Sequence, residues 1–240
     1  MITVDFNRID MKSGQSGQPF RVLDIGCGSG RHTCEAARFA NVFAVGADID
    51  IKDLQTAKDR RTSLQQADEY RGRWEIAATD VTCLPFSDGF FDLVICSEVL
   101  EHIPDQHKAA AEIARVVKPG QNLVVSVPTY LPEKICWTLS KDYHNEPGGH
   151  IRIYRKKEIA QLIERQGFAL GGTHYAHSLH APYWWLKCLV GVKRENSLPV
   201  NLYHRLLVWD MMQKPIITRW VERMLNPVIG KSVVLYFKKT

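Results

Sequence analysis

Short apolar runs alternate with longer segments of mixed polarity along the first half of the chain. Five of these runs have the length of strands that are buried on both faces: residues 21–25, 42–47, 74–78, 91–96 and 123–127. Three intervening segments are expected to be helices: residues 31–39, 52–70 and 109–117. This alternation predicts a doubly wound α/β fold with a parallel sheet, in which a ligand binds beyond the carboxyl ends of the strands.

The alternation ends at Pro128. Residues 129–150 are rich in Pro, Gly, His and Tyr, so we expect them to be irregular. The remaining regular elements are a helix, a strand and a final strand: residues 156–166, 168–175 and 232–238. Residues 178–229 form a helical insertion before the final strand. We therefore predict a single domain over the whole chain of 240 residues, with its core at 20–177 and 230–240.

A glycine-rich turn follows the first apolar run. Asp24 stands near the end of that run, and Gly26, Gly28 and Gly30 follow at alternate positions just before a helical segment. Glycines allow the backbone to approach a ligand closely, and a helix N-terminus adds free N–H groups. The combination predicts a nucleotide-type cofactor site. A dinucleotide fingerprint would carry its third glycine where Arg31 stands, and a carboxylate at Asp24 suits a cationic cofactor better than a pyrophosphate.

Acidic residues stand at the ends of four predicted strands. They are Asp24, Asp48, Asp80 and the glutamate of Ser97–Glu98. The carboxyl ends of parallel strands meet at one edge of a sheet, so these carboxylates would gather there and repel one another. A ligand with hydroxyl groups, an amine and a positive centre would relieve that repulsion. Taken singly, each of these acids has an alternative role as the cap of the next helix.

These motifs, in this order, resemble those of the class I S-adenosylmethionine (SAM)-dependent methyltransferases, in particular the group related to ubiquinone-biosynthesis methyltransferases. The resemblance extends over residues 21–127 and, more weakly, over 150–170. Further matching segments are Leu84–Phe86, Phe90–Val94 and Val117–Gly120. The resemblance implies SAM as the cofactor and a Rossmann-like, seven-stranded, mostly parallel sheet whose last strand is antiparallel.

The resemblance also implies a role for each motif. The glycine loop with Asp24 would surround the methionine part of SAM. Asp48 would accept both ribose hydroxyls, and Asp80 would lie beside the adenine amino group. The cofactor-binding residues expected on this basis are Asp24, Gly26, Cys27, Gly28, Gly30, Asp48, Ile49, Asp80, Val81 and Ser97.

A second group of candidate residues follows the strand at 91–96, where the resembled family carries out its reaction. On a helical turn Glu98, Glu101 and His102 would converge. They could form a divalent-metal site with His150 as a fourth ligand, or His102 could act as a base or orient the substrate, or the group could be a structural cap. We expect His102 and His150 to be the catalytic residues, because a base near neutral pH is most often histidine. No metal is assigned.

The composition narrows the location and the partners. Net charge is +5, hydrophobic residues make up 45% and charged residues 24%, as is ordinary for a soluble globular protein. The N-terminus has no apolar signal region, and no apolar run is long enough to span a bilayer. The six cysteines show no C-x-x-C spacing. We therefore expect a cytoplasmic protein without structural zinc.

The helical insertion is aromatic and basic. Residues 178–240 contain ten Lys or Arg against three acids, and apolar residues recur at helical spacing from Leu202 to Met212. We expect a lid over the substrate. Peripheral contact with an anionic membrane and a nucleic-acid surface are the alternatives. A net charge of +5 argues against nucleic acid, and the oligomeric state stays open.

The function expected from these features is methyl transfer from SAM to a small molecule that is apolar and quinone-like or lipid-like. Oxygen is the preferred acceptor atom. An RNA-directed methyltransferase and a protein that binds the cofactor without turnover are the alternatives. A nicotinamide oxidoreductase would also use this sheet, but the glycine spacing disfavours it.

Overall fold

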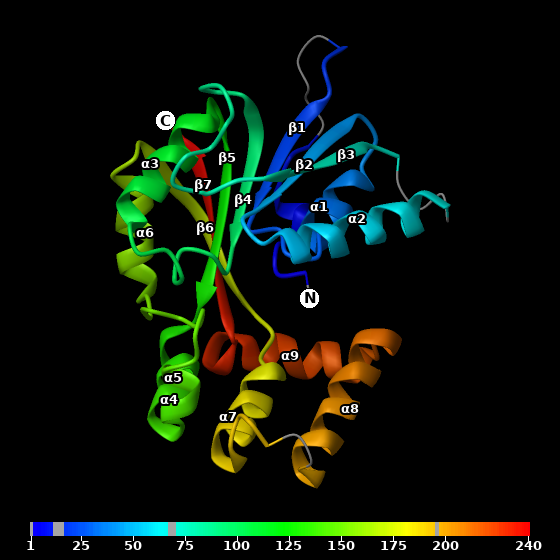
Figure 1. Ribbon diagram of the computed structural model, residues 1–240, viewed down its shortest axis with the longest axis vertical. Coiled ribbons are helices and arrows are strands. Elements are labelled where there is room, and N and C mark those ends of the chain that lie inside the picture. The colour runs from blue at the N-terminus through cyan, green and yellow to red at the C-terminus, as the bar shows by residue number, and fades with distance from the viewer. Residues whose placement is uncertain (1, 12–16, 67–70, 195–196) are drawn as a thin grey trace.

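The computed structural model describes residues 2–11, 17–66, 71–194 and 197–240. Its centre is a seven-stranded sheet in the order β3-β2-β1-β4-β5-β7-β6 (Figure 1). The strands are β1 (Phe20–Ile25), β2 (Val42–Asp48), β3 (Arg73–Ala78), β4 (Phe91–Ser97), β5 (Val117–Pro128), β6 (Phe168–Ala176) and β7 (Ser232–Lys239). The first five pair in parallel, and β7 runs antiparallel to both of its neighbours. The predicted doubly wound sheet with an antiparallel last strand is confirmed.

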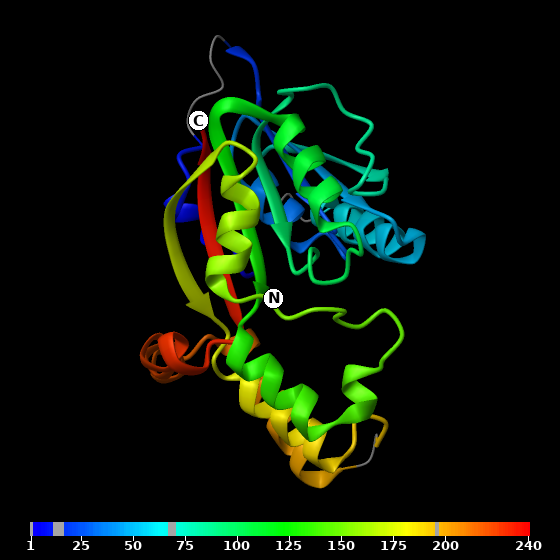
Figure 2. The same ribbon diagram turned by 90° about the vertical axis from the view of Figure 1, so that its left-hand side faces the viewer.

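Helices cover both faces of the sheet. On one face lie α1 (Arg31–Ala37) and α2 (Ile51–Gln66), and on the other lie α3 (Gln106–Val116) and α6 (Lys156–Glu164), as Figures 1 and 2 show. Each face has its own buried apolar cluster. Because both faces are covered, β4 is buried along its whole length up to Ser97. A short 3-10 helix, η1 (Phe6–Arg8), precedes β1.

A layer of further helices lies beyond the carboxyl end of β5 (Figure 1). Its members are α4 (Tyr130–Leu139), α5 (Lys141–His144), α7 (His180–Val190), α8 (Leu198–Gln213) and α9 (Ile216–Ile229). The last three fall within residues 178–229, and α4 packs against α7. We call these five helices the helical layer. None of the described helices combines the length and apolarity that crossing a membrane requires.

The prediction that residues 129–150 are irregular was wrong, because α4 and α5 occupy much of this range. Pro132 lies in the first turn of α4, where a missing N–H breaks no helical hydrogen bond. The apolar positions of α4 include the buried Cys136, which lies beside Cys188 of α7. The composition of this segment hid that periodicity.

Two other boundaries differ from the prediction. The helix expected at 109–117 begins earlier, at Gln106, because the Asp105 side chain caps it by accepting from the Lys108 N–H at 3.0 Å. The strand expected at 123–127 begins at Val117, which pairs with Phe91. Lys118–Gly120 form an irregularity within β5, where the register with β4 shifts. The end of the predicted helix 52–70 lies outside the described residues.

This topology determines where a ligand can bind. The chain runs from β1 outward through β2 to β3, and then returns to place β4 on the other side of β1. At such a switch point the connections leave β1 and β4 in opposite directions and open a crevice at the carboxyl ends of the strands.

Candidate functional site

A cavity of about 390 Å³ lies at this switch point. Its lining comes from the segments that follow β1, β2, β3 and β4. Eight of the residues singled out from the sequence line it: Gly26, Gly28, Asp48, Ile49, Asp80, Val81, Glu98 and His102. A volume of this size is typical of a small-molecule site.

The glycine loop is shaped by close packing. Gly26 has a φ of +64°, and a Cβ atom there would lie 2.3 Å from Cγ2 of Val99 in the segment after β4. Gly30 has a φ of +73°, and its Cβ would lie 3.1 Å from Ala57 and 3.2 Å from the Trp74 ring. The glycines therefore let the loop pack against the segment that follows β4 on one side and against α2 on the other. Gly28 is left facing the cavity.

Asp48 and Asp80 face the cavity from the ends of β2 and β3. Asp48 Oδ2 accepts a hydrogen bond from the Gly28 N–H at 2.8 Å, so it also braces the glycine loop. Asp80 Oδ1 accepts from the Thr82 N–H at 2.7 Å. Asp53, in the first turn of α2, is a third carboxylate on the cavity wall, and it was not predicted from the sequence. These carboxylates give the cavity a negative lining.

Asp24 lies beneath the loop and not on the cavity wall. Its Oδ2 accepts from the backbone N–H of Thr33 at 2.9 Å and from the Thr33 hydroxyl at 2.6 Å. Oδ1 is buried and has no hydrogen-bond partner among the described residues. Burial raises the pKa of Asp24 to about 7. Cys27, Gly30 and Ser97 are likewise not on the wall. The cofactor roles of all the residues named from the sequence stay predictions.

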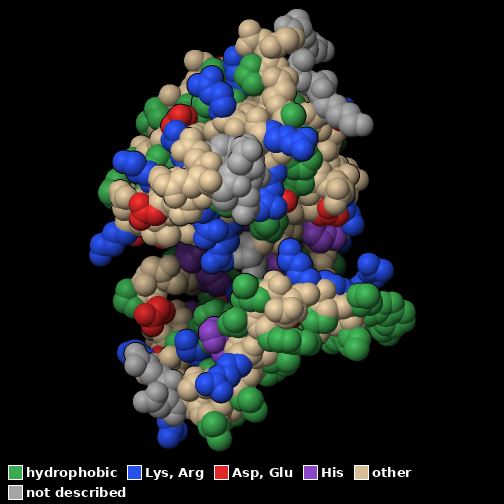
Figure 3. Space-filling model, turned by 90° about the vertical axis from the view of Figure 1, so that its right-hand side faces the viewer, with side chains coloured by type: hydrophobic (Ala, Val, Ile, Leu, Met, Phe, Trp, Pro, Cys, Tyr) green, Lys and Arg blue, Asp and Glu red, His purple; other side chains and the backbone are tan. Residues whose placement is uncertain are grey.

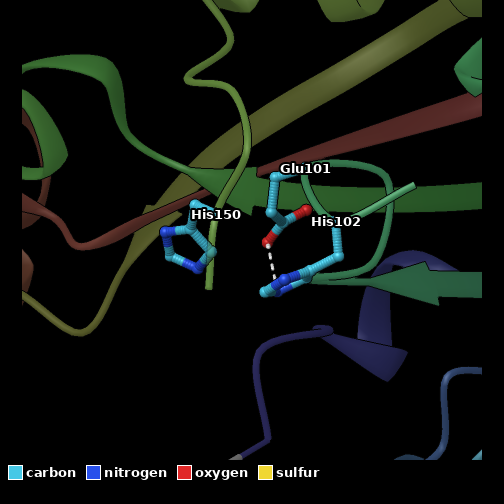
Figure 4. A group of neighbouring side chains, drawn as sticks. All are labelled: Glu101, His102 and His150. Atoms are coloured by element: carbon cyan, nitrogen blue, oxygen red, sulfur yellow. Dashed lines mark ion pairs between the residues drawn. The ribbon is translucent and has the colours of Figure 1, made fainter. Parts of the chain in front are cut away.

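A second group of side chains borders the cavity. Glu101, His102 and His150 point toward one another, as Figure 4 shows. Oε1 of Glu101 lies 4.0 Å from Nε2 of His102, and the two histidine rings are 4.9 Å apart. The structure thus brings together the two histidines expected to be catalytic, although they lie far apart in the sequence. Glu98 is not in this group, because its Oε1 accepts from the Ser126 hydroxyl at 3.0 Å.

A backbone carbonyl fixes the orientation of His102, and a carboxylate fixes that of His150. Nδ1 of His102 lies 3.1 Å from the carbonyl oxygen of Gly149, which can only accept. Nδ1 of His150 lies 2.6 Å from Oε1 of Glu133. The proton of a neutral His102 ring is therefore assigned to Nδ1, which leaves its Nε2 with a free lone pair.

The electrostatics of the group depend on burial. Glu101 is fully buried, and neither carboxylate oxygen has a hydrogen-bond partner within the described part of the chain. Burial, followed by repulsion from Glu98, raises the pKa of Glu101 well above its ordinary value. Burial and the neighbouring His150 lower the pKa of His102. For Glu133, burial acts to raise the pKa, but the hydrogen bond and charge of His150 lower it.

This arrangement has two chemical uses. A neutral imidazole with a free lone pair accepts a proton from a hydroxyl, and the neighbouring Glu101 carboxylate stabilises the resulting imidazolium. The same three groups, one carboxylate and two imidazoles, also form a donor set that divalent transition metals accept. The unpaired oxygens of Glu101 fit either a protonated histidine or a metal ion.

Two residues that hold the histidines in place were also not predicted from the sequence. Glu133 lies on α4, in the segment expected to be irregular, and it holds His150. Gly149 supplies the carbonyl that holds His102. A helical period around Glu133 was the only signal that could have found it, and Gly149 carries no signal of its own.

The fold and the cavity define a class: a doubly wound α/β domain whose cavity at the switch point is lined by a glycine loop and by carboxylates. A family model described as a methyltransferase domain matches residues 8–171 of this chain. The chain therefore belongs to the methyltransferase domain family, and the class I SAM-dependent family and its cofactor SAM, predicted from the motifs, are confirmed.

Curated relatives agree with this assignment. The ubiquinone biosynthesis O-methyltransferase of Aromatoleum aromaticum is 30% identical over 171 residues, which cover 66% of this chain and 67% of the relative. That of Aeromonas salmonicida is 29% identical over 70% of this chain and 73% of the relative. Methyltransferase GfsG of Streptomyces halstedii is 32% identical over 50% of this chain. The chain spans 40% of that relative's length and 51% of a demethylmenaquinone methyltransferase from Renibacterium salmoninarum.

Solved structures share the fold. A SAM-dependent methyltransferase from Methanosarcina mazei superposes with a TM-score of 0.60 at 18% identity, over 92% of this chain and 93% of the other. A geranyl diphosphate methyltransferase in complex with SAM gives a TM-score of 0.59 at 13% identity, over 95% of this chain and 81% of the other. At these identities the similarity concerns the fold alone.

Proposed function

We propose that the protein transfers the methyl group of SAM to a hydroxyl oxygen of a small, apolar, aromatic acceptor of the quinol class. The observation that carries the proposal is the group of Glu101, His102 and His150 beside the cofactor cavity. A group that accepts a proton from a hydroxyl is needed for oxygen methylation, and it must lie where the methyl group is delivered.

In this proposal one set of residues binds the cofactor and another set accepts the proton of the acceptor. When bound, SAM supplies an electrophilic methyl group on a good leaving group, so the protein's main task is orientation. Asp48, Asp80 and the glycine loop hold the cofactor in this proposal. His102 Nε2 accepts the proton of the acceptor hydroxyl, because burial keeps the ring neutral. Glu101 then stabilises the imidazolium at short range.

A divalent cation is a second way to activate the same hydroxyl. Glu101, His102 and His150 would hold it, and it would lower the pKa of the bound hydroxyl by acting as a Lewis acid. The observation that favours this candidate is the buried Glu101 carboxylate, whose two oxygens have no hydrogen-bond partner in the described residues.

Aromatic side chains next to this group support a planar acceptor. Tyr143 lies 6.4 Å from the His150 ring and 5.7 Å from the Trp184 ring, and its hydroxyl bonds Glu133 at 3.3 Å. Trp137 stacks on His144 at 4.0 Å. Rings of this kind bind flat apolar molecules by offset or edge contacts. Two relatives act in ubiquinone biosynthesis and on demethylmenaquinone by their names, which favours the same class here.

The test is a methyl-transfer assay with SAM and a panel of catechols, hydroquinones and longer-chain quinols, read by mass spectrometry as the gain of one methylene. Glu101→Gln keeps the shape but cannot carry the negative charge that would stabilise the imidazolium, so we expect kcat to fall about 100-fold while SAM affinity stays within about twofold. Glu75→Gln removes an exposed carboxylate on β3 and serves as the matched control.

The same assay in the presence of a chelator distinguishes activation by a histidine base from activation by a divalent cation. Loss of activity in EDTA that is restored by a divalent cation assigns the group to a metal, and full activity in EDTA assigns it to histidine base catalysis. Binding of SAM with no turnover of any acceptor would instead indicate a non-catalytic protein. RNA binding that weakens steeply with salt would indicate a nucleic-acid acceptor. A cytoplasmic location stays an expectation.

A further inference from the structure

Helix α9 turns its apolar face toward the solvent and its polar face toward the rest of the protein, the reverse of an ordinary surface helix. Its outer face carries Ile217, Trp220, Met224 and Val228, whose exposed fractions are 77, 62, 63 and 67%. These positions recur at helical spacing and form a stripe. A surface helix normally turns such a stripe toward the core. The sequence pattern alone shows the stripe, and the structure shows that it faces outward.

Polar contacts hold the other face of α9 inside the molecule. Glu222 is buried at 9% exposure and pairs with Arg219 at 2.9 Å. Arg219 also pairs with Asp210 of α8, which is buried. Asn226 Oδ1 accepts from the Ser178 N–H at 3.0 Å. Buried hydrogen bonds and ion pairs therefore fix the orientation of α9. Because of this orientation, its apolar face stays exposed.

Helix α8 presents a second apolar stripe. Leu198, Leu202 and Trp209 are exposed, while Val200 and Leu207 are buried on the opposite face. The two residues Lys214 and Pro215 join α8 to α9. We call the exposed faces of α8 and α9 together the apolar face. Figure 3 shows hydrophobic side chains gathered along the outer edge of the lower half of the molecule, with Lys and Arg side chains beside them.

The charges around the apolar face have one sign. Arg205 lies on the exposed side of α8, Lys214 lies at the joint, and Arg223 lies on the flank of the α9 stripe; within the described residues none of them forms an ion pair. The two described acids of α8 and α9, Asp210 and Glu222, are buried against Arg219. The outside of this helix pair is thus apolar and positive.

We propose that the apolar face docks the protein on the surface of a membrane that contains anionic lipids. Apolar side chains enter the boundary between headgroups and acyl chains, and flanking Lys and Arg side chains reach the lipid phosphates. Tryptophan is the aromatic residue best suited to this boundary, and Trp209 and Trp220 both lie on the face.

Charge favours a membrane over a second copy of the chain as the occupant. Two copies docked face to face would bring Arg205, Lys214 and Arg223 together with the same residues of the other copy. The acids that could neutralise them are already used inside each chain. An anionic bilayer supplies the missing negative charge and also covers the apolar side chains. This inference concerns a surface outside the cofactor cavity and is independent of the proposed reaction.

The test is co-sedimentation of the full chain with vesicles of phosphatidylcholine alone or with added phosphatidylglycerol. We expect binding to the anionic vesicles at least about tenfold tighter than to neutral ones, and weaker at high salt. The double variant Ile217→Glu/Trp220→Glu should lose this binding. Leu170→Glu places the same kind of change at an exposed apolar site on β6 and should bind like the wild type.

The controls make each outcome decisive. SAM affinity, measured by calorimetry, should be equal in all these proteins, which separates lost docking from lost folding. The double variant Arg205→Glu/Arg223→Glu should weaken binding to anionic vesicles and leave the weak binding to neutral vesicles unchanged. The proposal is overturned if the wild type stays in solution with every vesicle, or if Ile217→Glu/Trp220→Glu binds as well as the wild type. A dimer that the same double variant dissociates, with no vesicle binding, would overturn it in favour of a second copy.

Discussion

Asp24 and Asp48 end neighbouring parallel strands, yet they lie in opposite environments. Asp48 faces the cavity and holds Gly28, whereas Asp24 is buried and holds Thr33 at the start of α1. Burial raises the pKa of Asp24 to about 7. Ionising a carboxylate that is this deeply buried is unfavourable, so the protein without a cationic ligand is destabilised when Asp24 ionises.

We predict that this destabilisation is visible in the pH dependence of stability. Between about pH 4 and pH 7 the folded protein keeps a proton on Asp24 that the unfolded chain has already released. The free energy of unfolding contributed by this group therefore falls as pH rises through that window, by up to about 4 kcal/mol. In Asp24→Asn this contribution is absent. Urea unfolding without SAM at pH 5 and pH 8 should show a smaller loss of stability in the variant, and an equal loss in both proteins would contradict the prediction.

A second prediction concerns Gly26. Alanine there meets both a φ of +64° and an atom 2.3 Å away on Val99, so the loop must move away from β4. We expect Gly26→Ala to cost about 1–2 kcal/mol of stability and to weaken SAM binding about tenfold or more. Gly172→Ala is the control, since a Cβ there has nothing within 4 Å. Calorimetric titration with SAM and thermal unfolding measure both effects. Unchanged SAM affinity in Gly26→Ala would show that the loop does not depend on this contact.

Only some of the individual residues of the candidate site could be predicted from the sequence. Asp48, Asp80 and the glycines were predicted because strand ends and glycine spacing are local signals. Glu133 and Gly149 were not, because their importance arises from contacts with His150 and His102 that only the folded chain brings about. The burial of Asp24 was also unpredictable, since the direction of one side chain depends on the packing of α1.

At the scale of elements, the strands and most helices follow from local pattern, and the errors have identifiable causes. Each strand of the parallel part is buried on both faces and is therefore a short apolar run. Residues 130–139 were misjudged because their helix is stabilised by packing against α7, while their composition resembles that of a loop. The early start of β5 reflects pairing with Phe91, a contact distant in sequence.

The joint between α8 and α9 supports a third prediction. Arg219 is the cation for two buried carboxylates, Asp210 and Glu222. Arg219→Met leaves both unpaired, and because the guanidinium is partly exposed we expect a cost of about 2 kcal/mol, below that of a fully buried pair. Arg223→Met, on the exposed flank, should change stability by less than about 0.5 kcal/mol. Hydrogen exchange should show faster opening of α8 and α9 in Arg219→Met. Unchanged protection there would mean that the ion pairs do not hold the two helices.

At the scale of the whole molecule, the cofactor cavity and the apolar face belong to different parts. The cavity lies at the edge of the sheet, and the apolar face lies on the outside of the helical layer. A cavity of about 1040 Å³ separates α1 and α2 from this layer, with Arg31 and Arg60 on one side and Trp184 and Leu207 on the other. This space lies between the two parts on one side of the molecule, so we expect binding at one of them to have little effect on the other.

Hydrogen exchange with each ligand in turn tests this separation. SAM at 100 times its dissociation constant should stabilise the protein by about 2.7 kcal/mol. The added protection should be largest in the segments after β1, β2 and β4, which line the cavity, and should be absent from the outer face of α8 and α9. Anionic vesicles should give the reverse pattern, because they cover residues such as Trp220 and leave the cavity open. If SAM instead protected α8 and α9 as strongly as the glycine loop, the helical layer would be coupled to the cofactor site and would close over it.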